Sequence, residues 1–134
     1  MIEQRQVVIL CEDGEMREEN VRYGIELASR LKASFFLLML ARTAEEQLKD
    51  SLQKTFEGVL KRARAAGLSA EGEFRHGDKA SELLKSLASL SRPSAIVFGG
   101  DDTTPKSKGL KRSGHWLWKV AGQVGCPIVS PQRK

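Results

Sequence analysis

Residues 94–131 read SAIVFGGDDTTPKSKGLKRSGHWLWKVAGQVGCPIVSP, and the rest of the chain is interpreted from this stretch outward. It holds a short apolar strand at 95–98, a glycine pair, a lysine-rich loop, a helix that opens at Ser113, and a last strand at 127–130. A strand that leads through glycines and a basic loop to a helix start is typical of phosphate sites in α/β proteins. The N–H groups of a first helical turn have no intrahelical partner, and the helix dipole there favours anions. The loop is therefore the candidate binding site.

Charge is concentrated in the same region of the chain. Residues 101–134 hold seven of the 22 lysines and arginines but two of the 17 acidic residues, so this tail carries the whole net charge of +5. Four of the seven cations lie in the loop itself: Lys106, Lys108, Lys111 and Arg112. Two interpretations stay open. Either Ser113 caps the following helix and the loop collects a phosphate, or the loop is solvated and its charges serve solubility.

Length and composition bound the class of protein. A chain of 134 residues with 40% hydrophobic content predicts a single domain over 1–134 with one core. No apolar run approaches the ~18 residues of a membrane span, and no signal peptide precedes the first strand, so we expect a cytoplasmic protein. Cys11 and Cys126 lack metal-ligand or redox spacing, which indicates two reduced, buried thiols. No metal site is predicted beyond the Mg²⁺ that a nucleoside triphosphate would bring.

Hydrophobic periodicity predicts alternating strands and helices. The predicted strands are 7–11, 35–40, 69–76, 95–98 and 127–130, and the predicted helices are 15–32, 44–66, 80–87 and 117–124. This order predicts an α/β fold with a doubly wound, five-stranded parallel sheet and helices on both faces.

The apolar content of each strand sorts the strands within the sheet. The continuously apolar runs at 7–11, 35–40 and 95–98 are predicted to be central. The charged strand at 69–76 suits an exposed edge, and the short strand before Pro131 suits the other edge. The strand order 3-2-1-4-5 satisfies this sorting. Its topological switch lies between strands 1 and 4, and ligands bind outside the carboxyl ends of such strands.

Several short motifs occur in a fixed order along the chain. They are Asp13-Gly14-Glu15 after the first strand, Arg75-His76-Gly77-Asp78, the run 95–99, Gly109-Leu110-Lys111-Arg112, and Cys126-Pro127-Ile128-Val129. In this order and spacing the sequence resembles the universal stress protein family over essentially its whole length. The resemblance implies a Rossmann-like fold, similar to the adenine nucleotide alpha hydrolases, and a small regulatory protein in stress response. It also implies an adenine nucleotide, ATP or AMP, as ligand, a homodimer through the C-terminal edge strand, and a possible protein partner.

The same resemblance implies which residues contact the nucleotide. They are Cys11, Glu12, Asp13, Leu40, Gly99, Gly100, Lys111, Arg112, Ser113, Gly114 and His115. Nucleotide-binding members carry Gly-x-x-Gly, nine residues, then Gly-Ser or Gly-Thr. Here Gly99 matches the first glycine, Asp102 stands at the second, and Arg112-Ser113 stand at the Gly-Ser position. Asp13 either accepts a hydrogen bond from a ribose hydroxyl or caps the first helix.

Two functions compete. The first is a regulator that binds a nucleotide or another phosphorylated ligand at the strand 1/strand 4 crevice. The second is a nucleotide-free, homodimeric interaction module of the same fold. Nucleic-acid binding is disfavoured despite a pI of about 9.4, because aromatic residues are not interleaved with the cations. No nucleophile and base form a catalytic set, so we expect no enzyme, with at most slow, incidental hydrolysis of ATP.

Overall fold

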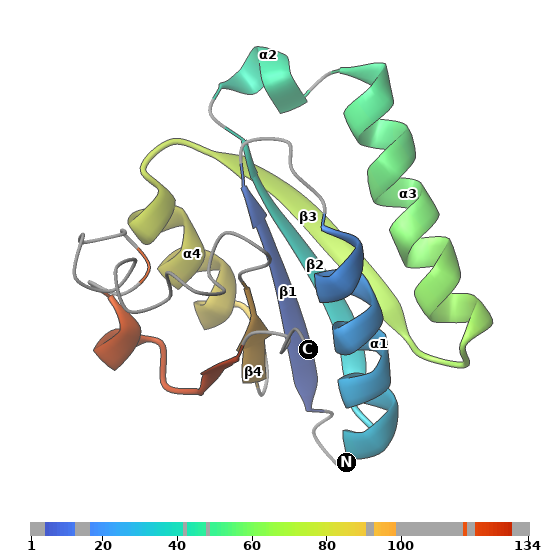
Figure 1. Cartoon of the computed structure of the whole chain (residues 1–134). Helices are drawn as coiled ribbons and strands as arrows, with labels where there is room; N and C mark the ends of the chain where they lie inside the picture. Colours follow the sequence, from blue (N-terminus) through green and yellow to red (C-terminus); the bar gives the residue numbers. More distant parts are fainter. Residues whose placement is uncertain are drawn as a thin grey trace.

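Five parallel strands form one sheet in the order β3-β2-β1-β4-β5 (Figure 1). The computed structural model describes residues 5–12, 17–41, 43–47, 49–90, 93–98, 117 and 120–129. The strands are β1 (Gln6–Glu12), β2 (Ser34–Ala41), β3 (Ala70–His76), β4 (Pro93–Val97) and β5 (Ile128–Val129). The predicted fold class and strand order are confirmed.

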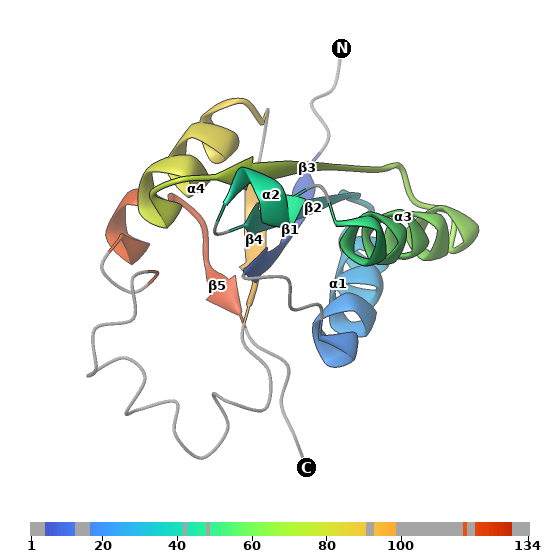
Figure 2. The same cartoon turned by 90° about the horizontal axis from the view of Figure 1, so that it is seen from above.

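Helices cover both faces of the sheet. α1 (Glu18–Leu31) and α3 (Asp50–Ala65) lie on one face. α4 (Lys79–Ala88) and the 3₁₀ turn η2 (Ala121–Gln123) lie on the other (Figure 2). The single turn α2 (Ala44–Gln47) lies beyond the carboxyl end of β2 (Figure 1). This layering hides the central strands from water on both sides.

The core is divided in two by the sheet, because successive side chains of a strand point to opposite faces. Val7, Ile9, Phe35 and Leu37 pack in the half that faces α1 and α3. The second half, which faces α4 and Leu117, contains the following strand residues: Val8, Leu10, Phe36, Leu38, Leu40 and Ile96. The predicted burial of the three central strands on both faces is therefore confirmed.

The long helix predicted over 44–66 is in fact two helices. Lys49 has an extended backbone (φ −65°, ψ 131°) and acts as the N-cap of α3, so the helix cannot pass through it. The chain leaves β2 at the carboxyl end of the sheet and has to turn before α3 can run back along the face. At its other end α3 stops as predicted at Gly67, whose φ is +91°. The Leu68 N–H donates to the Ala63 carbonyl and the Gly67 N–H to the Arg64 carbonyl, which is a Schellman motif.

Two other predicted helix limits were wrong. α1 begins at Glu18 with Arg17 as its N-cap, about three residues after the predicted start, so the cap of α1 is not Asp13. Within the α-helix predicted over 117–124, Leu117 is α-helical, but residues 121–123 form a 3₁₀ turn, in which the Gln123 N–H donates to the Val120 carbonyl three residues back. Two glycines in 121–125 weaken α-helix, and β5 follows within a few residues. Gly125, with φ +73°, ends the turn as predicted.

Candidate functional site

The carboxyl ends of β1, β2 and β4 meet at one edge of the sheet, on either side of the switch between β1 and β4. The register of β1 on β2 pairs Cys11 with Met39 and Glu12 with Leu40. The structure therefore brings three of the predicted site residues, Cys11, Glu12 and Leu40, to this edge. The other predicted site residues lie outside the described residues: Asp13, Gly99, Gly100, Lys111, Arg112, Ser113, Gly114 and His115.

Cys11 and Leu40 form the floor of this edge rather than its surface. Cys11 is 4% exposed and belongs to the core half under α1 and α3, whereas Leu40 is 1% exposed and belongs to the half under α4. Burial, with a smaller contribution from the charge of Glu12, raises the pKa of the Cys11 thiol to about 12. Cys11 is therefore a neutral thiol at physiological pH and a poor nucleophile. Cys126, predicted to be buried, is only half-buried.

Glu12 is the polar side chain that β1 presents at its carboxyl end. Its Oε1 accepts from Lys79 Nζ at 2.8 Å, and the two side chains are 20% and 23% exposed. A partly buried ion pair of this length holds both side chains in position. The sequence analysis missed Lys79, because 67 residues separate it from Glu12 and no local pattern marks it.

Lys79 is held in place by the start of α4. Asp78 is the N-cap of this helix, and its Oδ2 accepts from the Ser81 N–H at 2.9 Å. This hydrogen bond lowers the pKa of the Asp78 carboxyl below its usual value. The predicted turn at Gly77-Asp78 is confirmed, with φ of Gly77 at +122°. Because Asp78 defines where α4 begins, it also defines where Lys79, the first helical residue, points.

Charged side chains of β3 are tied to α4 beside this edge. Arg75 contacts Glu73 at 3.2 Å and Glu82 at 3.0 Å, and Ser86 Oγ donates to Glu73 Oε1 at 2.8 Å. The hydrogen bond with Glu82 raises the pKa of Arg75, and the same bond lowers the pKa of Glu82, with a smaller contribution from Lys85. β3 is an edge strand, as predicted, but these charges are engaged in a network with α4.

Solved structures share this architecture. A universal stress protein in complex with cAMP aligns with a TM-score of 0.64 at 17% identity, over 96% of this chain and 97% of that chain. The chain has the universal stress protein fold. A universal stress protein family member from Burkholderia pseudomallei gives a TM-score of 0.57 at 18% identity, over 94% of this chain and 96% of that one. A universal stress protein from Archaeoglobus fulgidus gives 0.59 at 13% identity, over 96% and 98%. The sequence matches no protein-family model and no curated protein.

Two further findings concern this universal stress protein fold. Within the described ranges, no three or more histidine, cysteine, aspartate or glutamate side chains come together as metal ligands would. Among the same residues, no helix is long and apolar enough to cross a membrane.

Proposed function

We propose that the chain is a small regulatory protein of the universal stress type. In this proposal an adenine nucleotide, or another phosphorylated ligand, binds at the crevice between the carboxyl ends of β1 and β4. The observation that carries the proposal is the sheet order β3-β2-β1-β4-β5, since the reversal between β1 and β4 is where such sheets bind ligands. A protein with the same fold and nearly full-length alignment is in complex with cAMP.

The residues at this edge suit a nucleoside phosphate. A carboxylate has about four lone-pair sites, more than one cation fills, so Glu12 can accept from a ribose hydroxyl while it binds Lys79. Lys79 is a cation within hydrogen-bond reach of the same carboxylate and supports an anionic ligand there. The sequence also predicts cations from the lysine-rich loop before Ser113. Lys111 and Arg112 are the two that stand nearest in the sequence to Ser113, where the phosphate is expected to bind. No catalytic role is proposed for any of these groups.

The first test is isothermal titration of the full chain with AMP, cAMP, ADP and Mg-ATP at low salt. The proposal expects a dissociation constant of roughly micromolar for at least one nucleotide. The variant Lys111→Glu should weaken binding by about tenfold or more, because it places a carboxylate beside the phosphates. Lys61→Glu is the matched control, since Lys61 is exposed on α3 and the charge change is the same. Equal weakening by both variants would mean that overall charge, and no local site, determines affinity.

Flat titrations with all four nucleotides would overturn the nucleotide proposal. They would favour the second function, a nucleotide-free interaction module. Asp102 in place of the second signature glycine is the observation that favours this alternative, because a carboxylate there repels phosphate and its side chain restricts close backbone approach.

Both functions include a homodimer through the C-terminal edge. In the part of the chain that the structure describes, β5 is the last strand of the sheet and pairs only with β4. Its two residues, Ile128 and Val129, are half-buried. An unpaired edge of this kind is a template for pairing with a second copy. Sedimentation velocity over a range of protein concentrations tests this part separately. A monomer at every protein concentration would contradict the homodimer and would leave the nucleotide proposal unchanged.

A further inference from the structure

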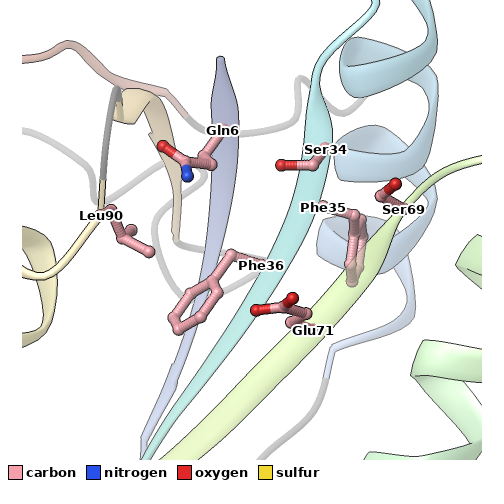
Figure 3. A pocket seen from close by; sticks show the side chains of 7 residues that line it. All are labelled: Gln6, Ser34, Phe35, Phe36, Ser69, Glu71 and Leu90. Atoms are coloured by element: carbon pink, nitrogen blue, oxygen red, sulfur yellow. The ribbon is translucent and has the colours of Figure 1, made fainter. Parts of the chain in front are cut away.

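A cavity opens at the amino end of the sheet, at the opposite end of the strands from the edge described above (Figure 3). Its volume is about 190 Å³. It is formed by the first residues of three strands, the segment that precedes β3, and the segment that follows α4: Gln6, Ser34, Phe35, Phe36, Ser69, Glu71 and Leu90. Neither of the functions proposed above uses this cavity.

The cavity lies on the α4 face of the sheet. Phe36 belongs to the core half that faces α4, and Glu71 is its register partner on the neighbouring strand β3. The Phe36 ring and the Glu71 carboxylate therefore lie side by side, as Figure 3 shows. α4 ends at Ala88, and Leu90, which packs against this core half, forms the apolar wall opposite Glu71.

Glu71 differs from its neighbours on β3. Glu73 and Arg75 are bound to side chains of α4, as described above. Glu71 forms no hydrogen bond or ion pair with any other residue in the described part of the chain, and it is the charged side chain in the cavity lining. A concave site whose carboxylate has no partner among the described residues disfavours an anion and favours a cation.

One other feature of the cavity acts in the same direction. The face of an aromatic ring attracts a cation within about 6 Å of its centroid, and Phe36 supplies such a ring. The carboxylate and the ring belong to two different strands, β3 and β2, so their common preference does not depend on one local sequence pattern.

We propose that this cavity binds a small organic ammonium ion with an apolar body. The ammonium group lies against the Glu71 carboxylate, and the apolar body lies between Phe36 and Leu90. Ser34 Oγ donates to the Arg5 carbonyl at 3.3 Å, so its remaining hydrogen-bonding capacity is that of an acceptor, which suits an ammonium N–H. At roughly 30 Å³ per water, 190 Å³ holds about six water-sized groups, which limits the ligand to one ring or a short chain.

The test is a titration of the ¹⁵N-labelled full chain with phenethylammonium chloride, followed by amide chemical shifts at low and high salt. The expected result is saturable shifts at the amides of Gln6, Phe36, Glu71 and Leu90, with affinity that falls as salt screens the carboxylate. Phenethyl alcohol, which has a similar shape and no charge, should produce no saturable shifts at these amides.

Single substitutions test which side chains bind the amine. Glu71→Gln should weaken binding of the amine by about fivefold or more, the range expected for one partly exposed ion pair. Glu57→Gln is the control, since Glu57 is exposed on α3, across the sheet, and loses the same charge. Phe36→Leu keeps an apolar core residue and removes the ring, so it should also weaken binding.

Three results would overturn the proposal. The first is equal shifts with phenethyl alcohol, and the second is unchanged affinity in Glu71→Gln. The third is a set of shifts centred away from the amino end of the sheet. The dispersion of the amide spectrum shows in each variant that the chain is folded, so loss of binding cannot be confused with loss of structure. The proposed nucleotide site lies at the other end of the strands. A negative result in the nucleotide titration would therefore not affect this test.

Discussion

Gly24 lies where α1 comes closest to the sheet, and its replacement by alanine tests how tightly the two are packed. A Cβ atom at this position would lie 2.6 Å from Ile9 Cγ1 and 2.7 Å from Ile9 Cδ1. Ile9 is fully buried, and the Phe35 ring lies 3.6 Å from the same point. Both side chains are buried, so relief of the contact requires Ile9 to repack or α1 to shift away from β1.

The expected size of the effect follows from two opposing terms. Alanine favours a helix over glycine by about 1 kcal/mol, which on its own would stabilise α1. Overpacking a well-filled core costs about 1–3 kcal/mol. Since Cβ contacts under 3.0 Å require movement, we expect the clash to win and Gly24→Ala to destabilise the fold by about 1–2 kcal/mol.

Gly58 on α3 provides the matched control. A Cβ there meets nothing within 4 Å, so Gly58→Ala makes the same chemical change without the clash and should stabilise the fold by about 0.5–1 kcal/mol. Urea unfolding followed by circular dichroism measures both variants, with opposite shifts of the midpoint and unchanged m values expected. In an Ile9→Val background, which removes Cδ1, the cost of Gly24→Ala should fall. A stabilised Gly24→Ala, or a cost that Ile9→Val leaves unaltered, would refute the packing argument.

Three other predictions follow from the described contacts. Gly72→Ala should destabilise by about 1–3 kcal/mol in urea, because its Cβ would lie 2.6 Å from the Phe56 ring; a neutral result would contradict this contact. The hydrogen bond from Arg62 lowers the pKa of Glu18 below 4.5, so its stabilisation is present above that pH and is lost as pH falls through the lowered pKa. Since both side chains are about half exposed, Glu18→Gln should cost less than about 1 kcal/mol at pH 7, and this cost should shrink as pH falls through the lowered pKa of Glu18, measured by urea unfolding over a series of pH values. Cys11, with a pKa of about 12, should stay unmodified by iodoacetamide at pH 8 until the chain unfolds, and mass spectrometry of the native protein after treatment would reveal any early labelling.

Much of the fold could be predicted from the sequence, because the apolar content of a segment indicates how far it is buried. The unbroken apolar runs in β1 and β2 require cover on both faces, and only central strands of a parallel sheet have it. The charges of β3 and the shortness of β5 assign those strands to the edges, from which the strand order follows. Gly67, Gly77 and Gly125 were found for a similar reason, since a left-handed backbone favours a residue without a side chain.

Other features were decided by the tertiary structure alone. The break at Lys49 has no local signal, because the geometry that forces it is the route from the end of β2 to the face under α3. The buried residues Val120 and Val124 flank the 3₁₀ turn η2 at a spacing of four, which an α-helix would also give, so periodicity cannot tell the two apart.

The pairing of Glu12 with Lys79, and of Phe36 with Glu71, depends on strand register and on where α4 begins and ends. Periodicity reports which face of an element is buried, but it carries no information on which residues of distant elements meet. The candidate site at the β1 edge and the cavity at the amino end are both built from such meetings, and this is why only the folded chain reveals them.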